Sequence, residues 1–327
     1  MDFNVPEELG SVQQLAQQIL NDFTEVEQLK QIEAQEDRFD GRLWQALADA
    51  GLLGLDMSES QGGTDMGFYA LTTLCEEVGR TVAPVPVVSV LVAAAGTLRR
   101  FGKDRQKERW LPEIASGAAL VTAALEEYGN DDPCNPCCQA QATEGGYAIS
   151  GTKICVSQAT SARRIMLPAR CGDELMVVLV DPQAAGVTLA PQVVTSGETR
   201  YELQLDNVQL PQEDVVASGA RALAAMDWAT QATRTALCAQ ALGACDKMMR
   251  ITGQYTSERE QFGRAVATFQ AVSHRVADCY IDVESLRLVT QQAASLLDQG
   301  RPAEEAVTIA KIWCGDVCHR VSQSSQH

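Results

Sequence analysis

The segment SEREQFGRAVATFQAVSHRVAD, residues 257–278, joins two long stretches with the periodicity of α-helices. Over residues 269–286, apolar side chains recur at steps of three and four, which is the spacing of one face of a helix. The same spacing runs over residues 306–321, after a brief turn at 299–302. Long helices joined by brief turns predict an antiparallel helical bundle over residues 218–327.

The part of the chain before this bundle changes character near Gly117. Between residues 12 and 118 the apolar side chains again follow a helical period, which predicts an N-terminal helical domain over residues 1–118. Residues 119–217 contain short β-type runs instead, some of them alternating between apolar and polar side chains. The predicted fold class is therefore mainly α with a central, mostly antiparallel β domain.

The β domain is expected to contain strands at 146–150, 153–157, 164–170, 175–181 and 200–205. The tripeptide Ser150-Gly151-Thr152, between the first two strands, is predicted to be a tight hairpin turn. Asp206-Asn207 and Pro211 are expected to close the domain.

The composition argues against binding to nucleic acids. The chain has 327 residues, with 43 Asp and Glu against 26 Lys and Arg, and its formal net charge is −17. Such a charge opposes the counterion release that drives binding to phosphate backbones. No apolar run approaches the roughly 18 to 20 residues that span a bilayer, and the start MDFNVPEELG lacks the features of a secretory signal. We expect a cytoplasmic protein without a membrane span.

The eleven cysteines are spread along the chain without a repeating interval. This distribution is typical of reduced thiols rather than of a disulfide framework. Cys134, Cys137 and Cys138 resemble half of a zinc site, but the partner pair is missing, since Cys314 and Cys318 lie far away in a helical pattern. We therefore interpret these residues as small buried or loop cysteines and predict no metal site.

The order of the segments and six local strings resemble the acyl-CoA dehydrogenase family along nearly the whole chain. The most specific string is the segment at 257–278 quoted above. The other five are LWQALADAGLLGLDMSESQGG (43–63), EEVGRTVAPVPV (76–87), FGKDRQKERWLPEIASG (101–117), GGYAISGTKICVS (145–157) and LDNVQLP (205–211). Any one string would be weak support, but six in the family's order argue strongly against chance similarity.

The resemblance implies an N-terminal helical domain, a β domain and a C-terminal four-helix bundle that together bind FAD and an acyl-CoA thioester. In the family, a glutamate removes the α-proton while a hydride passes from the β-carbon to the flavin. This chemistry needs a desolvated carboxylate, hydrogen-bond donors at the thioester carbonyl and a fixed flavin ring. The resemblance also implies a homo- or heteromeric tetramer that passes electrons to an electron-transfer flavoprotein.

Arg259, Phe262, Gly263 and Gln270 match the family residues that contact the FAD of a neighbouring subunit. A guanidinium suits a pyrophosphate because its fork of donors binds two oxygens at once. The phenyl ring can cover a flat ring edge, and the amide offers both a donor and an acceptor. The alternative is that Arg259 pairs with an adjacent glutamate on a solvated turn.

Arg234 matches an arginine that family members place near the bound acyl-CoA. It lies in an otherwise small and apolar helical segment, so a cation there needs an anionic partner. The alternative is a surface salt bridge to Asp227.

The catalytic base of the family has no counterpart in the sequence. In one group of family members it precedes the arginine that matches Arg234, and here that position is Thr233. The commoner position follows a Gly-Gly-x-Gly turn, which should begin just where the chain stops at His327. Either the sequence is truncated or the protein functions without its own base, so the catalytic residue is left unassigned.

The segments that face the flavin within one subunit of the family are altered here. Glu126 stands where the family has a hydroxyl donor, and a carboxylate there opposes flavin reduction through like-charge repulsion. Cys155 replaces a large aromatic side chain. Ser157 stands at a threonine position and keeps a hydroxyl that can donate to the flavin.

This asymmetry leads to three hypotheses. The sequence resembles the short, divergent subunit of the two-subunit acyl-CoA dehydrogenases of bacterial steroid side-chain degradation, which completes a flavin site on a catalytic partner. The second hypothesis is a self-sufficient homotetramer whose base lies beyond His327. The third is a structural subunit that binds no ligand. The acyl group of the substrate is not predicted.

Overall fold

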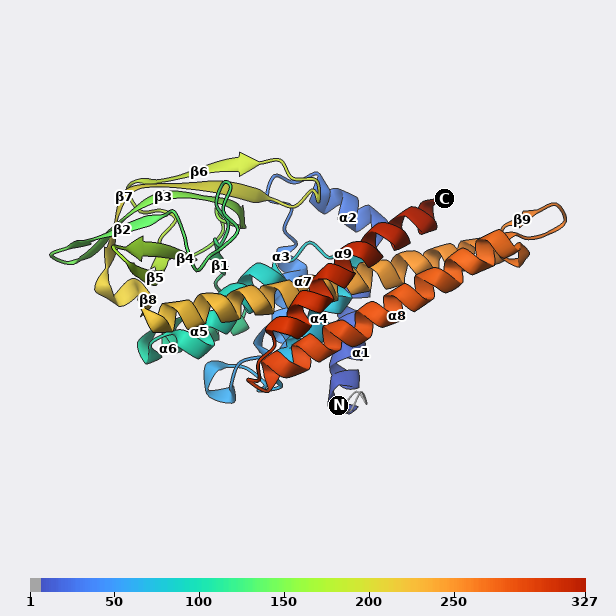
Figure 1. Cartoon of the computed structure of the whole chain (residues 1–327), viewed down its shortest axis with the longest axis horizontal. Helices are drawn as coiled ribbons and strands as arrows, with labels where there is room; N and C mark the ends of the chain where they lie inside the picture. Colours follow the sequence, from blue (N-terminus) through green and yellow to red (C-terminus); the bar gives the residue numbers. More distant parts are fainter. Residues whose placement is uncertain (1–6) are drawn as a thin grey trace. The chain divides into compact units, whose positions relative to one another are not determined.

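The computed structural model describes residues 7–327 and contains two compact units. The helical unit comprises residues 7–24, 67–83 and 234–327, and the sheet unit comprises residues 25–66 and 84–233. Helix α7 (Ala220–Glu258) contributes to both, because the division falls inside it. Figure 1 shows this helix with the hairpin at β9 at its C-terminal end.

The helical unit is built from α1 (Glu7–Phe23), α4 (Gly67–Thr81), the C-terminal part of α7, α8 (Gln270–Asp298) and α9 (Glu304–Gln326). Helices α8 and α9 pack along each other (Figure 1). Between α7 and α8 lie β9 (Glu260–Gln261), β10 (Arg264–Ala265) and the 3-10 turn η5 (Val266–Thr268). The three long helices predicted after residue 218 are thus confirmed.

Helices α4 and α7 meet backbone to backbone at a glycine. A Cβ atom at Gly243 of α7 would overlap the carbonyl oxygen of Glu76 in α4. Only a hydrogen atom leaves room for that carbonyl, so a larger residue would force the helices apart. The close crossing brings the polar side chains of both helices within reach of each other.

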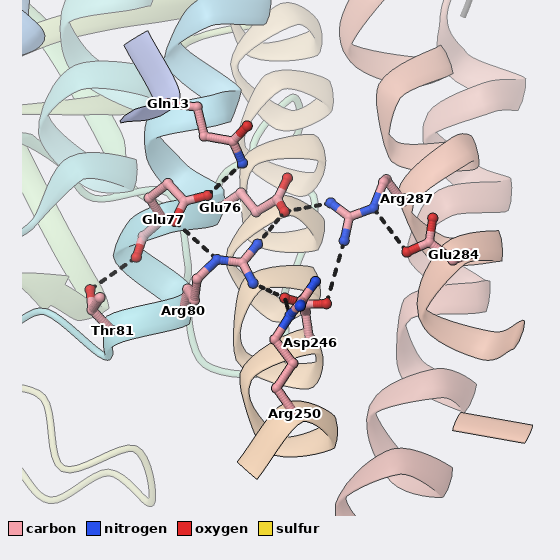
Figure 2. Close-up of polar contacts among 9 residues, drawn as sticks. All are labelled: Gln13, Glu76, Glu77, Arg80, Thr81, Asp246, Arg250, Glu284 and Arg287. Atoms are coloured by element: carbon pink, nitrogen blue, oxygen red, sulfur yellow. Dashed lines mark hydrogen bonds and ion pairs between the residues drawn. The ribbon is translucent and has the colours of Figure 1, made fainter. Parts of the chain in front are cut away.

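A buried cluster of charges lies at this crossing (Figure 2). Arg80 of α4 binds Glu76 at 2.7 Å and Glu77 at 2.9 Å on its own helix, and it also pairs with Asp246 of α7. Arg287 of α8 binds Glu76 at 2.6 Å and lies 3.7 Å from Asp246. Glu77 and Asp246 are fully buried, so both depend on the guanidinium groups for compensation of their charge.

The sheet unit contains helices before its sheet. They are α2 (Val26–Glu33), α3 (Gly41–Asp49), a π-helical segment η3 (Val88–Ala95), α5 (Gly96–Phe101) and α6 (Asp104–Ala115), with the 3-10 turns η1 (Leu52–Gly54) and η2 (Glu59–Gln61). A further 3-10 turn, η4 (Gln212–Asp214), lies between the last two strands of the sheet. Helix α3 begins at Gly41 because the buried Asp40 carboxylate accepts the amides of Arg42 and Leu43, at 3.0 and 3.1 Å.

The sheet has the strand order β6-β7-β3-β2-β4-β5-β8, with β1 paired to β4. Its strands are β1 (Val121–Ala123), β2 (Gln139–Thr143), β3 (Gly146–Ser157), β4 (Arg164–Cys171), β5 (Glu174–Val180), β6 (Val187–Gln192), β7 (Arg200–Pro211) and β8 (Val215–Ser218). Among these described strands, β4 pairs in parallel with β1 and β2, and the other pairings are antiparallel. The predicted central, mostly antiparallel β domain is confirmed, and with it the fold class.

Two details of the predicted β domain are wrong. Ser150–Thr152 is no hairpin turn, because β3 runs unbroken and pairs with β7 on both sides of Gly151. The register shifts between Ile149 and Gly151, which marks a β-bulge. Gly151 has φ +146°, and a Cβ atom there would lie 2.9 Å from the Cα of Cys138. Strand β7 likewise continues through Asp206 and Asn207 instead of ending there.

The structure also bears on membrane insertion. Within residues 7–327, no helix is both long enough and apolar enough to cross a bilayer.

Candidate functional site

The structure brings Arg259, Phe262, Gly263 and Gln270 together at the hairpin between α7 and α8. Arg259 directly follows α7, and its amide still donates to the carbonyl of Tyr255 at 2.8 Å. Phe262 and Gly263 form the two-residue turn between β9 and β10, with φ of 55° and 75°. Gln270 is the first residue of α8. Four residues that the sequence singles out therefore share one exposed tip of the helical unit.

The side chains of this hairpin face outward. Phe262 is 93% exposed, although its ring meets the ring of Phe269 edge to face at 6.2 Å. The guanidinium of Arg264 lies 4.1 Å above the Phe269 ring. A phenyl ring that is almost fully exposed in the isolated subunit, next to a guanidinium group, is typical of a surface that binds a partner or a ligand.

Arg259 has no ion pair among the residues that the structure describes. The alternative of a pair with an adjacent glutamate is therefore not found. Glu258 instead accepts a hydrogen bond from Gln254 at 3.0 Å. The Arg259 guanidinium remains exposed to solvent, and its donors are open to an anion from outside the helical unit.

Arg234 is exposed on α7. The alternative salt bridge to Asp227 is also not found in the described part of the chain, where Asp227 accepts a hydrogen bond from Gln231 at 2.9 Å. Thr233, at the position of one family base, has a buried hydroxyl with no hydrogen-bond partner among residues 7–327. A threonine hydroxyl is too weak a base to take up a proton near neutral pH. This position therefore supplies no general base.

In the sheet unit, Glu126, Cys155 and Ser157 lie together around the end of β3. The amide of Ile154 donates to the carbonyl of Glu126 at 3.0 Å. Cys155 has φ 56° and donates its amide to the Gln192 side chain at 2.8 Å. Burial raises the pKa of the Cys155 thiol, and the Glu126 carboxylate, which accepts a hydrogen bond from it, raises the pKa further. Ser157 is only 7% exposed.

Residues of β6 and β7 cover the same face with further polar contacts. Tyr128 donates its hydroxyl to Glu202 at 2.5 Å and accepts a hydrogen bond from Gln192 at 3.4 Å. Arg200 donates to the carbonyl of Cys155 at 3.2 Å and to Glu198 at 2.6 Å. This face therefore presents carboxylates and donors that already have hydrogen-bond partners. Sequence reasoning missed the roles of Gln192, Arg200 and Glu202.

A buried ion pair joins residues of β3 and of the segment that contains Glu126. Lys153 Nζ binds Glu127 Oε1 at 2.7 Å, and Lys153 is fully buried. Glu127 also accepts the amides of Cys137 and Cys138, at 2.6 and 3.0 Å. The carboxylate thus holds the loop that carries the cysteine cluster. Within the described residues, no three His, Cys, Asp or Glu side chains are grouped as metal ligands.

The ion pair between Glu127 and Lys153 predicts that the fold loses stability at acid pH. Burial raises the pKa of Glu127, but the hydrogen bond and charge of Lys153 and the two loop amides outweigh it and lower the pKa from 4.5 to about 2. Because the folded-state pKa is the lower one, the stabilisation is present above pH 4.5 and is lost as the pH falls toward about 2. We expect a contribution of about 3 kcal/mol near neutral pH.

Urea unfolding of the wild type and of Glu127→Gln from neutral pH to about pH 2 would measure this contribution. The stability difference between the two proteins should shrink across the acid range. Glu126→Gln removes the exposed neighbouring carboxylate and is the matched control. A difference that stays constant with pH would contradict the prediction.

Comparison of the chain with known proteins shows its family. The sequence model of the acyl-CoA dehydrogenase N-terminal domain matches residues 6–118, and that of the C-terminal domain matches residues 223–326. The chain belongs to the acyl-CoA dehydrogenase family. Members of this family are oxidoreductases that act on CH–CH bonds. Acyl-CoA dehydrogenase FadE27 of Mycobacterium tuberculosis is 30% identical over 338 residues, which cover 100% of this chain and 88% of FadE27.

Two solved structures resemble this acyl-CoA dehydrogenase closely. The "Tcur3481-Tcur3483 steroid ACAD G363A variant" is 39% identical with a TM-score of 0.91, covering 98% of this chain and 86% of that one. The ChsE4-ChsE5 complex from Mycobacterium tuberculosis is 31% identical with a TM-score of 0.92, covering 99% of this chain and 87% of that one. Each name joins two protein names, and ChsE4-ChsE5 is named a complex.

Proposed function

We propose that this chain acts in FAD-dependent α,β-dehydrogenation of an acyl-CoA thioester by completing the flavin site of a partner subunit. The observation that supports this proposal is the contrast between two faces of the chain. The α7–α8 hairpin offers an exposed Arg259 and Phe262, whereas the flavin-facing segment of the sheet unit offers Glu126 and Cys155. The first face suits an anionic dinucleotide and the second does not.

The hairpin residues fit the parts of FAD that a neighbouring subunit would present. Arg259 would hold pyrophosphate oxygens with its fork of donors. The Phe262 ring would pack against an aromatic edge of FAD and so be shielded from water. The Gln270 amide would donate and accept hydrogen bonds beside it. FAD, when bound, supplies the acceptor for the β-hydride. These residues position the cofactor and exclude water from it.

The sheet face does not fit a flavin of its own. The Glu126 carboxylate would lie where negative charge develops on reduction, and like-charge repulsion would oppose that step. Cys155 is too small to cover the ring system, and Ser157 is largely buried. We therefore propose that this face binds no flavin, and that the partner supplies both the flavin platform and the catalytic base.

The relatives support an assembly of unlike subunits. ChsE4-ChsE5 and Tcur3481-Tcur3483 are named as pairs, and the second is named a steroid ACAD. We propose that this chain likewise pairs with an unlike subunit and that the substrate is an acyl-CoA. Arg234 is the candidate contact to the acyl-CoA. A tetramer in the cytoplasm that delivers electrons to an electron-transfer flavoprotein, and the domain limits at residues 118 and 217, remain predictions.

Flavin stoichiometry tests the proposal. The chain would be purified alone and together with the acyl-CoA dehydrogenase subunit encoded beside it, and bound FAD would be measured by visible absorbance. We expect little flavin on the isolated chain and bound FAD on the complex. One FAD per isolated chain would contradict the proposal. A complex whose melting temperature responds to neither FAD nor acyl-CoA would favour the structural-subunit hypothesis instead.

A further inference from the structure

Four cysteines of the helical unit form a row of thiols between α7 and α9. The Cys245 thiol donates to the Cys318 sulfur at 3.8 Å, and Cys318 lies 3.9 Å from Cys314. Cys314 in turn hydrogen-bonds Cys238. All four are free thiols. Neither the hairpin contacts nor the altered sheet face uses any of them, so the proposed function leaves the row unexplained.

The row results from helical spacing on two neighbouring helices. Cys238 and Cys245 lie two turns apart on α7, and Cys314 and Cys318 lie one turn apart on α9, so each pair shares one face of its helix. The contacts advance in the same direction along both helices, and near their ends Thr252 of α7 donates to a carbonyl of α9 at 3.2 Å. The two helices are therefore parallel and hold the thiols in register.

We propose that Cys245 and Cys318 form a reversible disulfide that ties α9 to α7 when the protein meets a hydroperoxide. The sulfur atoms are 3.8 Å apart and must approach to about 2.05 Å in a disulfide. Side-chain rotation of two residues on facing helices can supply this approach. The resting state is the reduced one, since all four cysteines are free thiols in the structure.

Cys318 is the thiol that reacts first. It is half-buried, whereas Cys245 is 1% exposed. Hydrogen bonds from the Cys245 and Cys314 thiols lower the pKa of Cys318, and the thiolate is the nucleophilic form. An oxidant therefore meets the more exposed and more nucleophilic member of the pair.

The reaction proceeds in two balanced steps. The Cys318 thiolate attacks one oxygen of hydrogen peroxide, the O–O bond breaks, and a sulfenic acid and one water result after proton transfer. The Cys245 sulfur then attacks the sulfenic sulfur, and the S–S bond forms as the hydroxyl group leaves with the Cys245 proton as water. Two thiols and one peroxide thus give one disulfide and two waters.

Peptide mapping of the oxidised full chain tests the site. The protein would be treated with hydrogen peroxide, alkylated, digested without reduction and analysed by mass spectrometry. We expect a peptide pair joined through Cys245 and Cys318 that separates with dithiothreitol. The oxidised protein should melt about 5 °C or more above the reduced protein, because the bridge closes a long loop.

Matched variants give the controls. Cys318→Ser should abolish both the joined peptide and the melting shift, and Cys137→Ser, which removes an exposed thiol of the sheet unit, should change neither. If Cys318→Ser does not fold by circular dichroism, Cys245→Ala replaces it. The proposal is overturned if peroxide modifies Cys137 while Cys245 and Cys318 stay alkylatable. A bridge through Cys314, or Cys318 sulfinic acid without a joined peptide, also overturns it.

Discussion

Replacing Arg259 with alanine is expected to strip FAD from the assembled complex without disturbing the fold of this chain. The guanidinium has no ion pair among the described residues, so its removal leaves no buried carboxylate without a partner. Charge-assisted hydrogen bonds to a phosphate are worth about 1.5–3 kcal/mol. We therefore expect FAD to dissociate about 10- to 100-fold more readily, measured by flavin absorbance after gel filtration.

Two matched variants show whether the loss of FAD is specific to the Arg259 guanidinium. Arg264→Ala removes the same charge from the same hairpin, but its guanidinium stacks on Phe269 at 4.1 Å, so flavin content should stay near wild type. Glu126→Ala alters the sheet face of this chain and should also leave flavin content unchanged. Undiminished FAD in the Arg259→Ala complex would remove the main support for the proposed function. Loss of FAD in Glu126→Ala would mean that this chain holds its own flavin.

The fold and the hairpin could be predicted because their signals are local in sequence. Apolar residues at helical spacing indicate a helix with one buried face. Such spacing runs over 269–286 and 306–321, and these stretches lie in α8 and α9. Arg259 and Phe262 lie three residues apart in the connection between α7 and α8, so a single string contains both. A glycine between two β-type runs is ambiguous, however. Gly151 lies in a bulge rather than a turn because β7 pairs on both sides of it, and this partner lies far along the chain.

The sheet face could not be assembled from sequence for the same reason. Glu126 and Cys155 could be compared with family positions, but Gln192 and Glu202 reach this face only because β7 pairs with β3 and β6 pairs with β7. Their side chains form hydrogen bonds to residues that are distant in sequence. The alternation of polar and apolar residues along a strand does not predict such contacts. A polar residue occupies the same place in this alternation whether its side chain contacts water or another strand.

The charged cluster at the α4–α7 crossing is expected to be the most sensitive point of the helical unit. Arg80→Ala would leave Glu77 without an ion pair in the described chain, while Glu76 keeps Arg287 at 2.6 Å (Figure 2). Asp246 would keep Arg250 at 2.8 Å and Arg287 at 3.7 Å. Breaking a buried pair by removing one partner costs about 3–5 kcal/mol, because a carboxylate without compensation stays in a medium of low polarity. We expect a fall of about 10 °C in melting temperature, measured by circular dichroism.

The comparison variants show whether uncompensated charge is the cause. Lys30→Ala removes a cation from the exposed pair with Glu27, whose side chains are 63% and 78% exposed, and should cost at most about 1 kcal/mol. Adding Glu77→Gln and Asp246→Asn to Arg80→Ala should restore part of the lost stability, because the carboxylates that need the guanidinium become neutral. If the triple variant is less stable than Arg80→Ala, packing and hydrogen bonds, rather than charge, hold α4 against α7. A wild-type melting temperature for Arg80→Ala alone would mean that Arg250 and Arg287 compensate the buried carboxylates without Arg80.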